Sequence, residues 1–241
     1  EIGINHNGDL NLAKKLVFEA ATAGADAVKF QKRTIDQVYS QKELDKPRES
    51  PWGTTNREQK LGLEFNIEQY KELQSLARDL KLDFIVSCWD EESVDLVEEH
   101  LDVDYHKVAS ALATDKNFLL KLNKTGRPVI LSTGMCTEEY NLKHITTLKN
   151  NYPNCKVGFS NHCSGHDACI GAAALSAECI EFHITKDRTM YGSDQSASIE
   201  DYQKLISGIR KMEIMLGDGH KRIYSSELPI EKKLRKNNSF K

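Results

Sequence analysis

The feature that most constrains the fold of this chain is a repeated alternation of two kinds of segment. Short runs rich in Val, Ile and Phe are followed by longer segments whose apolar residues recur at helical spacing. The short runs are typical of buried strands, and the repeated strand–helix order predicts a parallel sheet with right-handed crossovers. The expected strands are residues 1–5, 27–32, 84–89, 105–110, 128–133, 156–161 and 179–185. The expected helices are residues 11–23, 67–81, 91–100, 115–123, 137–150, 167–177 and 200–216.

The number of these units favours a barrel that is one unit short. Seven strand–helix units are present, whereas a closed (β/α)8 TIM barrel has eight. Between the strand ending at Thr133 and the strand starting near Lys156 there is room for one helix only. We therefore expect an α/β fold of the (β/α)8 type that lacks one βα unit. A doubly wound open sheet is the alternative, and it too would place the chemistry at the C-terminal ends of the strands.

Length and composition narrow the classes of protein to consider. The 241 residues fit one large α/β domain, and the net charge of −3 argues against a nucleic-acid-binding surface. No apolar run approaches the roughly 18 residues that a membrane span needs, and no signal peptide is visible. The six cysteines include no CxxC pair, so we expect reduced thiols and a cytoplasmic protein. Segment 33–65 is expected to be a functional or disordered loop.

Polar residues gather at the C-terminal ends of the expected strands, which a barrel brings to one mouth. Lys29 and Lys107 lie inside apolar strands, where an unpaired ammonium is unfavourable, so each needs an anion. Ser110, Ser132 and Ser160 add hydroxyl donors. Two lysines with several hydroxyls suit a phosphate or a carboxylate ligand. Two alternatives remain: the lysines pair with carboxylates of the protein itself, or Lys107 is a Schiff-base nucleophile.

Two histidines lie at the ends of the last two expected strands. His162 and His183 each close a short apolar run, beside the expected anion site. Imidazole suits Mn, Fe, Co or Zn, with carboxylate or water completing the coordination. The pair is therefore a candidate metal site, and two hydrogen-bonded structural histidines are the alternative. His166 offers a competing pair with His162, but the Cys-Ser-Gly sequence between them favours a turn.

Seven motifs follow one another along nearly the whole chain: EIGINHNGD, AGADAVKFQK, KVASAL, ILSTGM, VGFSNH, IEFHITKDRTMYGSDQSAS and IRKMEIMLGDG. In order and spacing they resemble the sialic acid synthase family. The resemblance implies a βα-barrel, followed by a small antifreeze-protein-like domain that reaches a partner subunit's active site. It also implies a transferase that condenses phosphoenolpyruvate with N-acetylmannosamine or a related amino sugar, giving a nine-carbon sialic-acid-type sugar and phosphate.

The resemblance further implies roles for single residues. The protein ligands of a divalent metal, usually Mn²⁺ with Mg²⁺ or Co²⁺ as alternatives, would be His162 and His183. The phosphoenolpyruvate contacts would be Lys29, Lys107, Ser110, Ser132 and Ser160. The sugar contacts would be Glu1, Gln31 and Asp194. The residues that take part in catalysis would be Glu1, Lys29 and Lys107.

The chain also departs from the family pattern. The family has a further strand, with a motif like HCxSxYP, between ILSTGM and VGFSNH, and nothing like it follows Tyr140. We therefore place the missing βα unit between Tyr140 and Asn141. Phe182 stands where the family usually has a basic residue, and Cys88 stands where a threonine often contacts phosphate. These departures leave a third alternative, a sugar-phosphate-binding protein without catalysis.

The domain organisation and the partners follow from the same resemblance. Residues 1–220 are expected to form the catalytic barrel, and residues 221–241 a linker toward the antifreeze-protein-like domain. The expected partners are phosphoenolpyruvate, the amino sugar and, in the full-length protein, a second subunit in a domain-swapped homodimer. Neither nucleic acid nor a membrane is expected as a partner.

Overall fold

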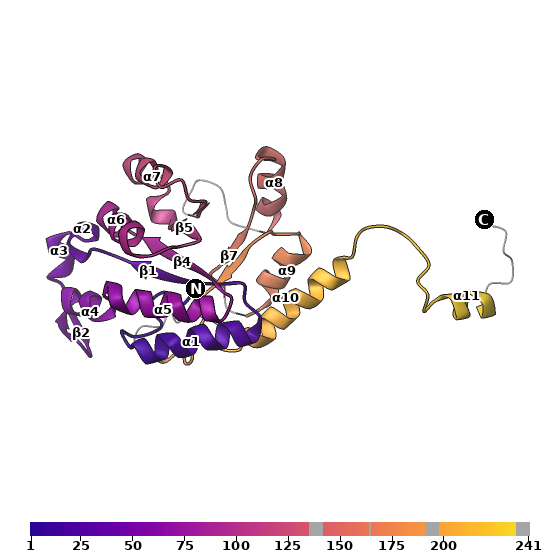
Figure 1. Ribbon diagram of the computed structural model, residues 1–241, viewed down its shortest axis with the longest axis horizontal. Coiled ribbons are helices and arrows are strands. Elements are labelled where there is room, and N and C mark those ends of the chain that lie inside the picture. The colour runs from indigo at the N-terminus through magenta and orange to yellow at the C-terminus, as the bar shows by residue number, and fades with distance from the viewer. Residues whose placement is uncertain (135–141, 164, 191–197, 235–241) are drawn as a thin grey trace.

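The computed structural model describes residues 1–134, 142–163, 165–190 and 198–234, and it shows an α/β fold built on parallel strands (Figure 1). The strands are β1 (Ala27–Lys32), β4 (Asp83–Cys88), β5 (Tyr105–Val108), β6 (Val129–Leu131), β7 (Phe159–Asn161) and β8 (Ile180–Phe182). Four of them pair in the order β1-β4-β5-β6, and β7 pairs with β8. All of these pairs are parallel, so the parallel sheet predicted from the alternation is confirmed.

The first residues of the chain join the two sets of strands. The Ile2 amide donates to the Lys29 carbonyl at 3.0 Å, and Gly3 forms a parallel bridge with Phe30. On the other side, the Ile184 amide donates to the carbonyl of Glu1 at 2.9 Å. The strands therefore follow one continuous parallel order, β7-β8-(residues 1–3)-β1-β4-β5-β6.

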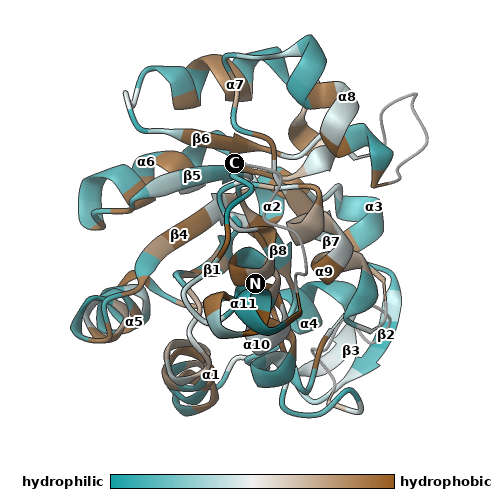
Figure 2. Cartoon of the chain, turned by 90° about the vertical axis from the view of Figure 1, so that its right-hand side faces the viewer, coloured by the Kyte–Doolittle hydropathy of each residue, from teal (hydrophilic) through white to brown (hydrophobic). Residues whose placement is uncertain are grey.

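Helices cover the outer side of this array (Figure 2). The main ones are α1 (Leu10–Ala23), α5 (Ile67–Asp79), α6 (Glu91–His100), α7 (Lys116–Asn123), α8 (Lys143–Asn151), α9 (Asp167–Ala174) and α10 (Tyr202–Leu216). In α1, Asp9 caps the first turn and Gly24 ends the helix in a left-handed conformation. The buried side chains of α1 are Ala13, Leu16, Val17 and Ala20. Their helical spacing gives α1 one apolar face, which packs into the core between α5 and α10.

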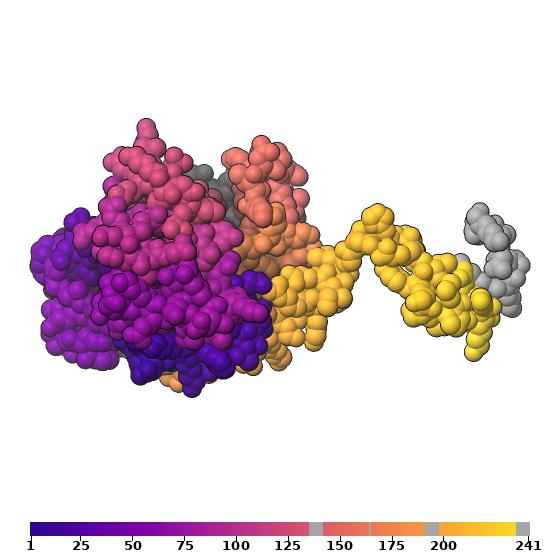
Figure 3. Space-filling view, viewed as in Figure 1, coloured from indigo at the N-terminus to yellow at the C-terminus, as the bar shows by residue number. Residues whose placement is uncertain are grey.

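The array is open between β6 and β7. Among the described residues, β6 pairs only with β5 and β7 pairs only with β8. Val129 and Leu131 of β6 are 41% and 46% exposed, whereas the apolar residues of β4 are buried. In the space-filling view α7 (pink) and α8 (salmon) form two separate projections of the surface (Figure 3). The TIM barrel is therefore not confirmed, because the described strands do not close. The expected junction of Tyr140 with Asn141 falls outside the described residues.

Segment 33–65, expected to be a loop, contains five short elements. They are α2 (Ile35–Val38), α3 (Gln41–Leu44), β2 (Pro47–Ser50), β3 (Gly53–Thr55) and α4 (Asn56–Leu63). β2 and β3 form an antiparallel hairpin, and Thr55 forms a capping box with Glu58 at the start of α4. The Trp52 ring lies against Gly62, where an added Cβ would be 2.1 Å from the ring. The segment is thus folded rather than an irregular loop, and it begins at the C-terminal end of β1.

Beyond α10 the chain leaves the body of the molecule and reaches α11 (Leu228–Leu234), none of whose residues is buried (Figure 1). In the described part of the chain, no helix is both long and apolar enough to cross a membrane. The cysteines that the structure describes are free thiols: Cys88, Cys155, Cys163, Cys169 and Cys179.

Candidate active site

Charged side chains from distant parts of the sequence meet inside the strand array. Lys29 of β1 and Lys107 of β5 both contact Glu181 of β8, with an Nζ–Oε distance of 3.2 Å in each pair. Lys29 also forms an ion pair with the carboxylate of Glu1. All four side chains are largely buried, so each charge relies on its partners rather than on water. The two lysines therefore pair with the protein's own carboxylates, which is one of the alternatives that the sequence left open.

This cluster shows that the strand array is strongly curved. Three strand positions separate β8 from β5 in the hydrogen-bonded order. In a flat sheet with strands about 4.8 Å apart, β8 and β5 would therefore lie about 19 Å from each other. The 3.2 Å contact between Lys107 and Glu181 crosses that separation. The array must therefore curl so that its inner side chains face one another across a common interior.

The charges in the cluster shift one another's pKa values. Burial lowers the pKa of Lys29 to about 8, and the nearby Lys107 adds to this effect while Glu181 opposes it. Burial alone would raise the pKa of Glu181, but the two lysines outweigh it and hold that pKa well below its usual range. At neutral pH the Glu181 carboxylate, which lies between Lys29 and Lys107, is consequently ionised.

The three predicted serines lie around this cluster. Lys107 Nζ donates to Ser132 Oγ at 2.6 Å, just beyond the end of β6. Ser110 begins the 3-10 turn Ser110–Leu112 after β5, and its side chain lies next to Gly134. Ser160 of β7 lies 3.4 Å, Oγ to Nε2, from His162. Ser132 thus lies on the lysine side of the site and Ser160 on the histidine side.

Two of the residues assigned to the sugar contact each other, Glu1 at the start of the chain and Gln31 on β1. Gln31 Nε2 donates to Glu1 Oε1 at 3.3 Å, so Gln31 and Lys29 approach the same carboxylate. The guanidinium of Arg33 in turn donates to Gln31 Oε1. Asp194, the third residue assigned to the sugar, lies outside the described residues.

His162 and His183 lie side by side at the ends of β7 and β8. Their ring centroids are 5.3 Å apart, with the ring planes at 52°. Burial lowers the pKa of His183 to about 3, so this imidazole is neutral, as a metal ligand must be. His166 instead pairs with Asp201 at 2.7 Å, so the competing His162–His166 pair does not form.

These two imidazoles fit a divalent metal that takes few ligands from the protein. The described residues contain no group of three or more His, Cys, Asp or Glu side chains that could hold an ion. Two imidazoles at this spacing leave the remaining positions of such an ion to water or substrate oxygens.

Glu181 is the site residue to which sequence reasoning assigned no role. The signal was present, because Glu181 and His183 are two residues apart on one strand and so share its inner face. Phe182 points to the other face, where it packs against the core. The departure of Phe182 from the family pattern is therefore directed away from the cluster.

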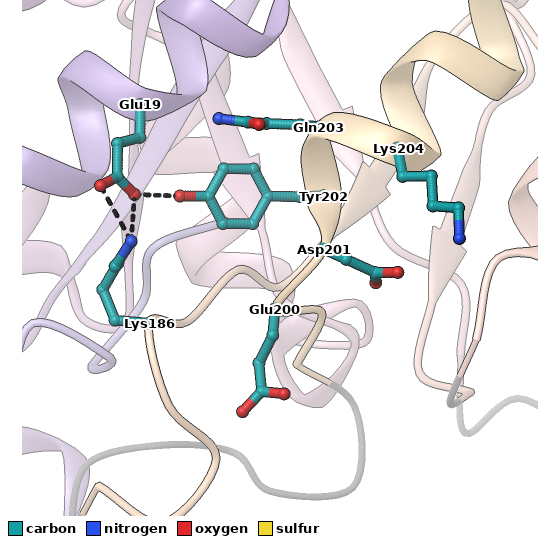
Figure 4. Close-up of a pocket in the computed structure, with 7 residues that line it drawn as sticks. All are labelled: Glu19, Lys186, Glu200, Asp201, Tyr202, Gln203 and Lys204. Carbon is teal, nitrogen blue, oxygen red and sulfur yellow. Dashed lines mark hydrogen bonds and ion pairs between the residues drawn. The ribbon is translucent and has the colours of Figure 1, made fainter.

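A separate cleft of about 310 Å³ lies on the surface between α1 and the start of α10 (Figure 4). There the Glu19 carboxylate accepts hydrogen bonds from Lys186 and Tyr202. These charges pair within the cleft, and none of its lining residues belongs to the lysine–carboxylate cluster. We therefore place the candidate active site at the buried cluster and not in this cleft.

Comparison with known proteins gives matches along nearly all of the chain. A model described as the NeuB family matches residues 16–140 and 136–221. N-acetylneuraminate-9-phosphate synthase of Mus musculus is 35% identical over 98% of this chain and 75% of its own length. N,N'-diacetyllegionaminic acid synthase of Campylobacter jejuni is 36% identical over 94% of this chain and 79% of its own length. The crystal structure of N-acetylneuraminic acid synthetase from Leptospira borgpetersenii in complex with citrate superposes with a TM-score of 0.80 at 26% identity, covering 98% of this chain and 91% of that one.

The alignments also show that the relatives carry residues that this chain lacks. They extend over 271 and 267 residues, which is more than the 241 residues of the chain. Both relatives therefore carry residues inside the aligned span that have no counterpart here. The two matches to the family model meet at residues 136–140.

Proposed function

Because the chain belongs to the NeuB family of synthase enzymes, we propose that it condenses phosphoenolpyruvate with an N-acetylated amino sugar. The products would be a nine-carbon sugar acid and inorganic phosphate. The observation that carries the proposal is the buried cluster in which Lys29 and Lys107 converge on one carboxylate, beside the imidazoles of His162 and His183. The names of the relatives, which make sialic and legionaminic acids, support an amino sugar as the acceptor.

In this proposal, phosphoenolpyruvate takes over the charge partners that the lysines now find in the protein. Its phosphate and carboxylate would bind Lys29 and Lys107, with Ser132 already 2.6 Å from the Lys107 ammonium. Both ammonium groups are held before the substrate arrives, so they can stabilise negative charge without reorganising during the reaction. Glu181 would then be released from its two ion pairs and face the reacting atoms.

The remaining groups would handle the sugar. Carbon 3 of phosphoenolpyruvate attacks the aldehyde of the open-chain sugar, water adds at carbon 2, and phosphate leaves with cleavage of its C–O bond. Glu1, which accepts from Gln31 and pairs with Lys29, would orient the sugar and exchange a proton with it. Bound by His162 and His183, a divalent metal, Mn²⁺ by our expectation, would supply Lewis-acid polarisation of the aldehyde oxygen.

The contacts of Lys107 do not favour the Schiff-base alternative. A Schiff base forms from a free, neutral amine, whereas Lys107 Nζ is engaged in an ion pair with Glu181 and donates a hydrogen bond to Ser132. Trapping with borohydride and pyruvate checks this point: we expect no covalent adduct on Lys107.

The main test is phosphate release from phosphoenolpyruvate, measured with a panel of N-acetylated hexosamines and their phosphates. We expect release that depends on the sugar, and Lys107→Met should lower kcat/KM for phosphoenolpyruvate by about 10²–10³-fold. Lys121→Met is the matched control, because Lys121 of α7 pairs with Asp95 of α6, away from the buried cluster. Sugar-independent release, or equal kinetics for the two variants, would count against the proposal.

The metal site has its own test. Chelation should abolish phosphate release and Mn²⁺ should restore it, whereas His183→Ala should lower both the metal content of the purified protein and its activity. His166→Ala, which removes a histidine paired with Asp201 instead, should change neither. Full activity after chelation would leave His162 and His183 as structural histidines.

The wider organisation is proposed on the same basis. Residues 1–220 would form the catalytic domain and residues 221–241 a linker, which is supported by the exposure of the described residues after α10. The free thiols support a cytoplasmic location. A domain-swapped homodimer of the full-length protein remains the expected assembly.

A further inference from the structure

Gln31 is held between two charged groups whose chemistry fixes the orientation of its amide. Gln31 Nε2 donates to Glu1 Oε1 at 3.3 Å, and the Arg33 guanidinium donates to Gln31 Oε1. An ionised carboxylate only accepts hydrogen bonds, and a guanidinium only donates them. The opposite orientation would set the amide oxygen against the carboxylate and the amide nitrogen against the guanidinium, and both contacts would be repulsive. Glu1 and Arg33 together therefore select one orientation of the Gln31 side chain.

The surroundings of Gln31 leave it little room to move away from Glu1. The Tyr70 hydroxyl of α5 donates to the Gln31 carbonyl at 2.6 Å, which holds the backbone at this position. A Cβ added to Gly3 would lie 2.9 Å from Glu1 Oε1 and 3.1 Å from Gln31 Nε2, so both polar groups lie close to the Gly3 backbone. The freedom that remains to Gln31 is rotation of its amide, and Arg33 restricts that rotation.

Arg33 is itself anchored on several sides. Its Nη1 donates to Glu64 Oε1 at 3.3 Å, and its backbone N–H donates to Glu64 Oε2 at 3.2 Å. The guanidinium lies over the Trp89 ring, 4.6 Å from the ring centroid. Because the Arg33 side chain is only 10% exposed, these contacts rather than water determine where the guanidinium lies.

The hydrogen bonds of the guanidinium use its terminal nitrogens and leave Nε unused. Arg33 Nε and Trp89 Nε1 are both buried, and neither has a hydrogen-bond partner among the described residues. Buried donors are nearly always paired in folded proteins. A guanidinium that reaches both Gln31 and Glu64 while one of its own donors stays unpaired is placed for those two contacts.

We infer that Arg33 is a positioning residue, which orients the Gln31 amide toward Glu1 and the acceptor sugar. This inference rests on the proposed function, which places the sugar at Glu1 and Gln31. One N–H of the oriented amide donates to Glu1, and the other is left for an oxygen of the sugar. Because Arg33 acts through Gln31, its loss should weaken the sugar side of the site and spare the phosphoenolpyruvate side.

The test is a cycle of Arg33→Met, Gln31→Met and the double variant, followed by steady-state kinetics. Each single variant should lower kcat/KM for the amino sugar about tenfold, the effect of one hydrogen bond to a charged group, with KM for phosphoenolpyruvate changed less than about twofold. The double variant should lose no more than Gln31→Met alone, because Arg33 acts through that amide. Losses that multiply in the double variant would show that Arg33 acts by another route and would overturn the inference.

Two further variants separate orientation of the amide from charge alone. Arg33→Lys keeps the charge, but one ammonium does not reproduce the planar fork that reaches Gln31 and Glu64 together, so it should remain as impaired as Arg33→Met. Lys32→Met is the matched control, because Lys32 pairs with the same Glu64 carboxylate at 3.3 Å but points to the opposite face of the strand from Gln31. This control should keep the wild-type kcat/KM. Full activity of Arg33→Lys, or an equal loss in Lys32→Met, would overturn the inference.

Titration calorimetry with the amino sugar separates this inference from the proposed reaction. Equal weakening of sugar binding by Arg33→Met, Gln31→Met and the double variant supports the positioning role, even if no phosphate is released from phosphoenolpyruvate. That pattern without turnover would overturn the proposed reaction instead. Unchanged sugar affinity in Arg33→Met would overturn the positioning role whatever the activity, and a wild type that binds no amino sugar would overturn both.

Discussion

At the scale of single residues, the buried cluster places opposing demands on Lys29. The ammonium must stay charged to hold an anion, yet burial favours its neutral form. Glu1 and Glu181 offset this effect in the free protein by pairing with it. An incoming anion would find a lysine that is still protonated at neutral pH but close to losing its proton.

This balance predicts a loss of activity in mild base. Because the pKa of Lys29 is lowered to about 8, its charge is present below that pH and lost above it. We expect kcat/KM for phosphoenolpyruvate to fall as the pH rises through about 8, since this parameter reports the free enzyme. A guanidinium does not titrate in this range, so Lys29→Arg should move the decline above pH 9. A wild-type profile that stays flat to pH 9.5 would contradict the assignment.

Part of this cluster could be predicted from the sequence alone. Lys29 and Lys107 stand out because they interrupt apolar strands, and that pattern indicated a buried anion site. Glu181 as their shared partner could not be predicted, because the contact depends on how far the strand array curls. The unpaired donors Arg33 Nε and Trp89 Nε1 are likewise visible only once the two side chains are stacked.

At the scale of secondary-structure elements, the start of α1 packs closely against the folded segment 33–65. Gly8 has φ of +70°, and an added Cβ would lie 2.1 Å from the carbonyl oxygen of Gly62 in α4. Gly62 in turn lies under the Trp52 ring. The contact of Gly8 with Gly62 therefore holds α4 against the start of α1. The contact of Gly62 with the Trp52 ring holds the β2–β3 hairpin against α4.

Substituting Gly8 should consequently be more harmful than its backbone angle alone implies. Gly126 is a matched control, because it has φ of +72° and no atom within 4 Å of an added Cβ. Gly126→Ala should lower the free energy of unfolding by about 1–2 kcal/mol, the cost of the left-handed conformation. Gly8→Ala should lower it by at least about 3 kcal/mol, because backbone atoms must also move apart. Equal losses in urea denaturation would show that the contact is not tight.

The main strands and helices were easier to predict than the short elements of segment 33–65. Strand β1 was expected at residues 27–32 and is found there, and α6 was expected and found at residues 91–100. Both have strong periodicity of their own. The elements within 33–65 are three to eight residues long, too short to show a period. They are held by contacts such as Trp52 on Gly62, which no local pattern reveals.

At the scale of the whole molecule, the opening between β6 and β7 is the main departure from a complete barrel. Each of these strands has one partner among the described residues, and β6 exposes Val129 and Leu131. Unpaired strand edges with apolar side chains promote association between molecules. The relatives carry additional residues within the aligned span, and the two family matches meet between these strands. These findings support the expectation of one missing βα unit.

Restoring such a unit should stabilise the protein. We would insert, between Tyr140 and Asn141, the residues that the mouse synthase carries in excess within the aligned span. A gain of ~2 kcal/mol from the covered edges would raise the Tm by about 4–8 °C in a chain of this size. Self-association in light scattering should decrease as well. A Gly-Ser insert of equal length is the control, and an equal or lower Tm than this control would argue against a missing strand.

The pairing of residues 1–5 with the last strands affects how the molecule is assembled during synthesis. Asn5 Nδ2 donates to the Ile184 carbonyl at 2.7 Å and to Ser198 Oγ at 3.0 Å, across separations of 179 and 193 residues. At a translation rate of about 5–20 residues per second, Asn5 waits roughly 10–40 s for these partners. Throughout that interval Lys29 has emerged without Glu181, and the edge of residues 1–3 that later pairs with Ile184 is unpaired. The interior of the strand array, with the candidate active site, is therefore completed last, and the nascent chain is most dependent on chaperones just before β8 leaves the ribosome.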